Sequence, residues 1–371
     1  MKPFPAIKFK SFRLSWLAIT GITGFIAGAI VFFLLCLWLP IQPLIVAAII
    51  CTCIITFLFQ AFSGKIIRGT ETYVFYRYSI SVTVAVSLVL YLLGQPVQMY
   101  LDSFVIGMGI FHLSGRFGCL GSGCCYGRPY SFGIVYREHF RATGFPSWLI
   151  NKKLFPVQLF EIGGIMIITI FCLFCLLSPH VTGSIWTMYV VLYAGIRYFL
   201  EFFRGDDDRP YLFHLSEAQW TSLVLMLFVS AGKPAHWWPV SGWMLGLCAF
   251  YFLFSLILIF IYQLQPQLKV NSSIHVSEIA GNMHRYLDHT AKQPGPPMVL
   301  STALGIHYSL SCLDPKTKKE WLCTLSYTGK GKSSSAVRRI FRVIKHLFFP
   351  TYFVTEKKGQ NEIYHFILRS N

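Results

Sequence analysis

Long runs without a charged side chain are the feature that most constrains this chain. Residues 14–64, 78–101 and 162–196 contain no Asp, Glu, Lys or Arg, and residues 218–268 contain only Lys233. The charged fraction is 13% and the mean hydropathy +0.56, whereas soluble domains average about 25% charged residues. Such runs cannot form a surface that faces water. The sequence therefore predicts an all-α polytopic membrane protein, and it excludes a soluble enzyme and an outer-membrane barrel of alternating strands.

The apolar runs divide into seven to eight expected transmembrane helices. Their predicted ranges are 14–38, 44–64, 78–93, 100–115, 157–177, 183–203, 217–231 and 241–264. Pro40 and Pro43 separate the first two, because proline cannot continue a helix. The polar residues 117–155 follow the fourth span and predict a folded segment outside the bilayer, which we call the head. Residues 1–268 thus form one transmembrane domain.

A second domain is predicted after Pro266. Residues 269–371, the tail, contain 15 basic and 6 acidic residues and have the composition of a soluble domain. Helical spacing and strand-like alternation predict a small α+β domain whose role the sequence leaves open. The helices are expected over 276–290 and 333–348, and the strands over 298–313, 320–328, 351–356 and 362–368.

The tail also carries a prediction about two cysteines. If its first hairpin turns at Lys316–Lys319, Cys312 and Cys323 occupy opposed positions on neighbouring strands. Opposed strand positions lie about 4.5–5.5 Å apart at Cα, within the range of a disulfide bond. An oxidising compartment would then permit a Cys312–Cys323 bond.

The net charge of +17 indicates what surrounds the protein. A basic excess in a membrane protein usually reflects loops that meet anionic lipid, so membrane lipid is an expected partner and nucleic acid is not.

Charged residues inside a bilayer are costly, so each one is a functional hypothesis. His112 and Arg116 are four residues apart and share a helix face, and so do Arg197 and Glu201. Glu161 lies just inside the fifth span. The structural alternative is that Arg197 and Glu201 form a plain ion pair and that Arg116 reaches the interface.

These residue types point to an anionic lipid. Arginine is a rigid planar fork that suits phosphate, and two or three arginines near the interface suit a phospholipid head group. Carboxylates beside them would orient the guanidinium groups. A nearby histidine such as His112 could act as a base.

The segment Gly115–Gly127 is rich in glycine and cysteine, which allows sharp turns and close approach to a ligand. Its thiols Cys119, Cys124 and Cys125 have no second pair of Cys or His ligands at zinc-finger spacing. We therefore expect them to be neither metal ligands nor nucleophiles, and no metal site is predicted.

Four motifs occur in a recognisable order. They are Gly-Arg with its glycine-rich turn from Gly115, Pro-x-Gln-Leu-Phe-Glu from Pro156, Arg-Tyr-Phe-Leu-Glu-Phe-Phe-Arg-Gly-Asp from Arg197, and Leu-Ser-x-x-Gln from Leu215. In this order the chain resembles the prolipoprotein diacylglyceryl transferase family over roughly residues 40–232. It departs from the usual family pattern after Gly-Arg, where Cys124 stands in place of a glutamate, and in its extra tail.

The resemblance implies an activity for residues 1–268. A family member transfers the diacylglyceryl group of phosphatidylglycerol to the lipobox cysteine of a preprolipoprotein in the bacterial inner membrane, and it needs no cofactor. By resemblance, Arg116 and Arg197 would hold the phosphate and Glu201 would orient Arg197. The histidine of the family would fall near Tyr76 and Arg77, so His112 is the candidate base in its place. The residues expected to line the substrate site are Gly115, Tyr126, Gln158, Glu161 and Arg204.

Two alternatives remain at this point. One is a protein of the same fold that uses another acceptor or is inactive, and the other is an anion or lipid transporter.

The orientation of the protein in the membrane is also open. The resemblance places the head, and with eight spans both termini, outside the cell. The positive-inside rule predicts the opposite, because the basic residues crowd onto that side.

Overall fold

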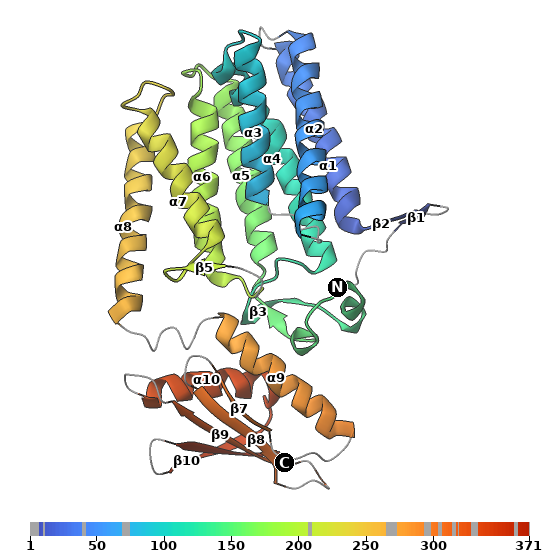
Figure 1. Ribbon diagram of the computed structural model, residues 1–371, viewed down its shortest axis with the longest axis vertical. Coiled ribbons are helices and arrows are strands. Elements are labelled where there is room, and N and C mark those ends of the chain that lie inside the picture. The colour runs from blue at the N-terminus through green and yellow to red at the C-terminus, as the bar shows by residue number, and fades with distance from the viewer. Residues whose placement is uncertain are drawn as a thin grey trace.

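A computed structural model describes two parts of the molecule, a helical bundle and a smaller α+β domain beyond one end of it (Figure 1). The described residues are 7–9, 12–38, 42–68, 75–206, 210–264, 273–292, 298–302, 306–313, 317, 319–327, 333–359 and 363–370. The predicted fold class, a polytopic helical protein with an α+β tail, is confirmed.

Each predicted apolar segment forms one helix of the bundle. The helices are α1 (Trp16–Trp38), α2 (Pro43–Arg68), α3 (Phe75–Leu92), α4 (Val97–Ser122), α5 (Val157–Leu176), α6 (Ser184–Leu200), α7 (Glu217–Gly232) and α8 (Gly242–Leu264). Within the described residues, five of them are long and apolar enough to cross a membrane, namely α1, α2, α4, α5 and α8. The chain is therefore a multi-pass membrane protein.

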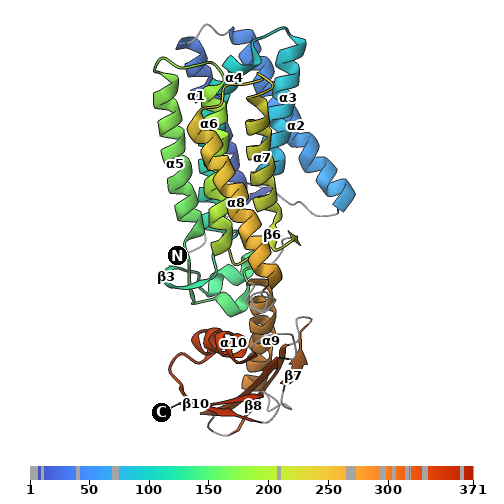
Figure 2. The same cartoon turned by 90° about the vertical axis from the view of Figure 1, so that its left-hand side faces the viewer.

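The head, N-terminal hairpin and tail lie at the same end of the bundle (Figures 1 and 2). The hairpin pairs β1 (Ile7–Phe9) with β2 (Phe12–Leu14). Helix α8 runs along the outside of the bundle toward the tail (Figure 2). The first and the last described segments of the chain therefore lie on the head side of the bundle.

The head is built around aromatic side chains. It contains β3 (Pro129–Val135) paired with β4 (Lys153–Leu154), and the 3-10 helices η1 (Glu138–Thr143) and η2 (Ser147–Leu149). It begins later than predicted, because α4 continues to Ser122 and ends only where Gly123 takes a left-handed conformation, with φ of 74°. The glycines before it are tolerated because transmembrane helices accept glycine more readily than soluble ones.

Helix α4 lies at the centre of the bundle and packs against α1, α3, α5 and α6. Gly28 of α1 and Gly107 of α4 face each other so closely that a Cβ on either would overlap the backbone of the other helix. Small residues at such crossings let membrane helices pack by van der Waals contact between backbones.

A buried carboxylate joins α4 to the start of α6. Asp102 accepts hydrogen bonds from the backbone N–H of Gly183, at 2.5 Å, and of Trp186, at 2.8 Å. The first N–H groups of a helix have no partner within it and attract negative charge. The role of Asp102 is therefore structural, although the residue lies inside a span.

The tail has the predicted mixed composition. Its elements are α9 (Ser273–Lys292), β7 (Met298–Ser301), β8 (Ile306–Cys312), β9 (Glu320–Tyr327), α10 (Ser333–Phe348), β10 (Phe353–Lys358) and β11 (Tyr364–Arg369). The strands form one antiparallel sheet in the order β10-β11-β9-β8-β7. Phe341 of α10 stacks on Phe366 of β11 with ring centroids 3.6 Å apart, which fixes the helix on the sheet.

The predicted pairing of Cys312 with Cys323 is wrong. Cys323 lies opposite Leu310, and Cys312 lies opposite Trp321, so the register is displaced by two residues. Within the described residues, no disulfide joins these two cysteines. The buried face decides the register, because Leu310 and Cys323 are both fully buried in the tail core.

The tail packs against the head. Ala280 of α9 and Leu347 of α10 are buried in the same apolar cluster as Trp148 and Leu149 of the head. In addition, the Lys152 ammonium donates a hydrogen bond to the backbone carbonyl of Leu347. Burial lowers the pKa of this lysine.

The close approach of α1 and α4 yields a stability prediction. Gly28→Val should lower the free energy of unfolding by about 1–3 kcal/mol, because the new side chain must push the two helices apart. Gly21→Val is the matched control on the same helix, since a Cβ at Gly21 meets no atom within 4 Å. Thermal unfolding in detergent measures both, and equal melting temperatures for the two variants would contradict the packing described.

Candidate functional site

Seven buried polar residues gather at the head end of the bundle, whereas Asp102 lies near the other end of α4. Their side chains come from α4, α5, α6, the 3-10 helix η3 (Glu201–Phe203) and the residue that follows it. Each residue is no more than 6% exposed; they are His112, Arg116, Gln158, Glu161, Arg197, Glu201 and Arg204. A concentration of buried charge of this kind is costly in a membrane and marks a functional site.

Glu161 is the centre of this cluster. One of its carboxylate oxygens lies 2.9 Å from an Arg116 nitrogen and 3.9 Å from Nε of Arg197. The same oxygen accepts a hydrogen bond from the Tyr193 hydroxyl at 3.0 Å. His112 Nε2 lies 3.9 Å from it. One carboxylate thus connects side chains from three helices.

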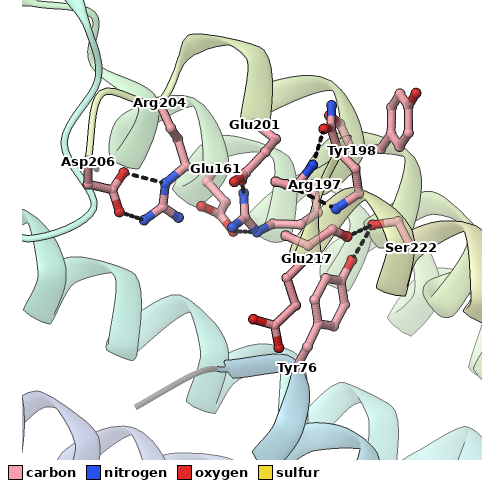
Figure 3. A network of polar contacts seen from close by, with 12 residues as sticks. Tyr76, Glu161, Arg197, Tyr198, Glu201, Arg204, Asp206, Glu217 and Ser222 are labelled. Carbon is pink, nitrogen blue, oxygen red and sulfur yellow. Dashed lines mark hydrogen bonds and ion pairs between the residues drawn. The ribbon is translucent and has the colours of Figure 1, made fainter. Parts of the chain in front are cut away.

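Arg197 has a second carboxylate partner. Its guanidinium donates to Glu201 at 2.5 Å, across one turn at the end of α6. Figure 3 shows Arg197 beside both Glu161 and Glu201. The predicted spacing of four residues therefore produces an ion pair that holds the guanidinium in one orientation.

Arg204 forms a separate bidentate pair next to the cluster (Figure 3). Its Nε and Nη2 donate to the two oxygens of Asp206 at 2.9 and 2.7 Å. Burial raises the pKa of the Asp206 carboxyl, and the positive charge of Arg204 opposes that shift. Asp206 keeps this arginine in place beside the thiols described below.

Three other predicted site residues, Gln158, Tyr126 and Gly115, lie outside the ion pairs that Glu161, Glu201 and Asp206 form with the arginines. The Gln158 amide donates to the Cys124 carbonyl at 2.9 Å and to the Tyr136 hydroxyl at 3.1 Å, so it fixes the start of the head. The ring of Tyr126 packs inside the head, 5.0 Å from that of Phe145. Gly115 faces open space on α4.

Tyr193 and Asp206 belong to the site although the sequence analysis did not select them. Tyr193 hydrogen-bonds both Glu161 and, at 3.1 Å, His112 Nε2, and its ring meets the histidine ring edge-on at 4.5 Å. Tyr193 lies four residues before Arg197, so helical spacing would have identified it. Asp206 was visible as the second residue after Arg204.

An apolar pocket lies between α1, α2, α3 and α4, partly open to its surroundings. Phe32, Phe104 and Met108 are among its lining residues. Met108, His112 and Arg116 follow one another at intervals of four residues on one face of α4, and α4 rises about 12 Å from the first to the last. The site therefore offers cationic groups near the membrane surface and apolar space deeper in the bilayer.

Three thiols converge at the end of α4. The sulfur atoms of Cys119, Cys124 and Cys125 all lie within 4.8 Å of one another. Thiol hydrogen bonds from Cys119 and Cys124 lower the pKa of the Cys125 thiol, and the charges of Arg204 and Arg116 lower it further. The sequence offers no second pair of ligands at zinc-finger spacing, but the fold brings these three thiols together in space.

The central position of Glu161 gives a prediction. Glu161→Gln should lower the free energy of unfolding by about 3–5 kcal/mol, because Arg116 then keeps its buried charge without a carboxylate. Glu217→Gln is the matched control: Glu217 pairs with Arg77 at 3.0 Å, but both side chains are about 40% exposed, so its loss should cost about 0–1 kcal/mol. The melting temperatures of the two variants in detergent are compared with that of the wild type. A decrease for Glu161→Gln as small as that for Glu217→Gln would contradict the role assigned to the Glu161 carboxylate.

Comparisons with known proteins agree with this geometry. The sequence profile of the family described as prolipoprotein diacylglyceryl transferase matches residues 6–232. Proteins named phosphatidylglycerol–prolipoprotein diacylglyceryl transferase are similar to the chain. One from Dehalococcoides mccartyi is 33% identical over 136 residues, which is 36% of this chain and 48% of that protein. One from Clostridium tetani is 30% identical over 129 residues, 34% of this chain and 49% of that protein.

A third relative with that name, from Helicobacter hepaticus, is 27% identical over 188 residues, 48% of this chain and 62% of that protein. The chain spans about half the length of the first two relatives. The matched profile covers the whole bundle up to the end of α7, including every residue of the charged cluster. The chain therefore belongs to the prolipoprotein diacylglyceryl transferase family.

Proposed function

We propose that this chain transfers the diacylglyceryl group of phosphatidylglycerol to the lipobox cysteine thiol of preprolipoproteins, forming a thioether. The observation that carries the proposal is the pair Arg116 and Arg197, buried at the head end of the bundle and held by Glu161. Family membership and the names of the relatives support it. The site of action is the bacterial inner membrane.

The arrangement suits the head group of a phospholipid. A guanidinium has five N–H donors, so Arg116 and Arg197 keep donors for a phosphate beyond those directed at carboxylates. The apolar pocket between α1, α2, α3 and α4 gives an acyl chain a place beside the helix that carries Arg116. Binding a whole amphiphile in this way sets the glyceryl carbon at a fixed depth near the arginines.

The reaction needs a good leaving group. The substrate sulfur attacks the glyceryl carbon that carries the phosphate oxygen, the carbon–oxygen bond breaks, and glycerol phosphate departs with the electron pair. Arg116 and Arg197 stabilise the charge that grows on the phosphate, and one such group in a low-dielectric site contributes roughly 3–4 kcal/mol. Glu201 and Glu161 orient the arginines, and Arg204 adds positive charge at the rim.

His112 has a positioning role in this proposal. The Tyr193 hydroxyl donates its hydrogen to Glu161, so its oxygen accepts from Nε2 of His112. This chain of hydrogen bonds ends on the same Glu161 oxygen that faces the arginines, and it helps to fix the carboxylate. Proton removal from the substrate thiol is then left to another group, considered below. Gln158 and Tyr126 hold the head over the site, and Gly115 leaves open space beside it.

The two-arginine site predicts the effect of a conservative substitution. Arg197→Lys should lower the transfer rate about 100- to 1000-fold, because lysine keeps the charge and loses the bidentate fork. The measurement is transfer of label from radiolabelled phosphatidylglycerol to a synthetic lipobox peptide by the purified protein.

Arg141→Lys is the matched control. Arg141 pairs with Glu138 at 2.8 Å, three residues away, but on the exposed surface of the head, so this variant should keep wild-type transfer. Wild-type transfer by Arg197→Lys would overturn the assignment of this arginine. Binding of phosphatidylglycerol without transfer in the wild-type protein would overturn the proposed reaction and favour another acceptor or transport.

A further inference from the structure

The thiols of Cys119, Cys124 and Cys125 form a cluster beside the charged site. Their sulfur atoms lie within 4.8 Å of one another, and each residue is partly exposed. The cysteines of the bundle interior, such as Cys36, Cys53 and Cys172, are buried instead. The three clustered thiols therefore differ from cysteines that only fill apolar space.

The chain brings these thiols together by the way α4 ends. Gly123 closes the helix in a left-handed conformation with its N–H bonded to the Cys119 carbonyl, and the N–H of Cys124 reaches the same carbonyl at 3.2 Å. Cys125 also has a left-handed backbone, with φ of 56°. The chain thus folds back over the helix end and returns its side chains to Cys119.

Neighbouring segments hold this turn in place. Gln158 of α5 donates to the Cys124 carbonyl at 2.9 Å. The N–H of Gly205 donates to the Tyr126 carbonyl at 3.0 Å, and Gly127 and Arg204 form a β-bridge. These contacts hold the backbone that carries the three thiols, as outer-shell contacts do around a metal site.

We infer that Cys119, Cys124 and Cys125 bind one Zn²⁺ ion and that its fourth coordination position takes the sulfur of the incoming substrate cysteine. Thiolates are soft ligands that select zinc, and a tetrahedral ion with three protein ligands keeps one position for water or substrate. All three residues are partly exposed, which is consistent with a centre that substrate can reach. The identity of the fourth ligand rests on the proposed function, whereas the zinc site does not.

The surrounding charge fits such a centre. Zn²⁺ with three thiolates carries a net charge of −1. Arg116 lies one turn before Cys119 on α4, and Arg204 pairs with Gly127, two residues after Cys125. The positive charges of Arg116 and Arg204 offset the negative charge of the metal centre. Because Arg116 also holds the phosphate in the proposed reaction, the metal centre lies close to the reacting groups.

A zinc ion at this position would promote deprotonation of the substrate thiol, a step that the proposed reaction assigns to no residue of the charged cluster. The substrate thiol loses its proton to water when it coordinates zinc, because a metal-bound thiol is deprotonated outright. The bound thiolate attacks the glyceryl carbon, its electron pair forms the carbon–sulfur bond, and the carbon–oxygen bond breaks toward the phosphate. No oxidant, reductant or further reactant is needed.

The first test is metal content. The full-length protein is purified in detergent with a reductant and a tag free of histidine, and metals are measured by inductively coupled plasma mass spectrometry. We expect about one zinc per chain. Cys119→Ser, Cys124→Ser and Cys125→Ser should each weaken zinc binding by about 10-fold or more, since even outer-shell changes cost about 10- to 100-fold.

Cys51→Ser is the matched control, because this residue is exposed on the surface of α2 and lies outside the cluster. It should keep the wild-type zinc content. Monodisperse elution on size exclusion and unchanged circular dichroism identify variants that remain folded. A wild-type protein that neither contains zinc nor binds added Zn²⁺ or Co²⁺ would overturn the inference. So would zinc content unchanged in all three cluster variants, or two of the thiols recovered as a disulfide from protein prepared without reductant.

The second test concerns the open position. Co²⁺ replaces zinc, and its visible absorption reports on tetrahedral thiolate coordination. A lipobox peptide should change this spectrum, and the same peptide with serine in place of cysteine should not. If the cysteine peptide leaves the spectrum unchanged, the substrate sulfur does not occupy the fourth coordination position, and that half of the inference is overturned. Neither test uses lipid transfer, so a protein that binds zinc but transfers nothing would refute the proposed function and leave the metal site standing.

Discussion

The buried charged site depends on one carboxylate, that of Glu161. Glu161 accepts contacts from Arg116 and Tyr193 and lies 3.9 Å from both Arg197 and His112. Two guanidinium groups this deep in a membrane protein would repel each other and lose their hydration without such a partner. The carboxylate makes their approach tolerable, and it leaves each arginine with donors that an anionic head group can use.

The rest of the bundle positions the helices that carry this cluster. The close glycine crossing of α1 and α4 and the Asp102 contact with the start of α6 both fix α4 at the centre. Helix α4 supplies Arg116, and its end supplies the thiol turn. The tail packs on the head through Ala280 and Leu347, so it supports the segment that follows α4.

Sequence reasoning predicted the helices well because charge-free runs and proline breaks leave little choice in a membrane. It also predicted Arg116, Glu161, Arg197 and Glu201, since ionisable residues in apolar runs are conspicuous. It missed what depends on contacts between distant segments. The continuation of α4 to Ser122 moved the start of the head, the buried face of the tail sheet set the cysteine register, and the thiols of Cys119, Cys124 and Cys125 meet only because of the turn after Gly123.

In the proposed function, Arg116 and Arg197, held by Glu161, bind the phosphate of an anionic phospholipid. The most direct measurement is a cryo-electron microscopy map of the protein in nanodiscs that contain phosphatidylglycerol. The account predicts head-group density within hydrogen-bond distance of both guanidinium groups, with an acyl chain in the pocket lined by Phe104 and Met108. A well-resolved lipid whose phosphate lies away from both arginines, with the Glu161 contacts unchanged, would contradict it.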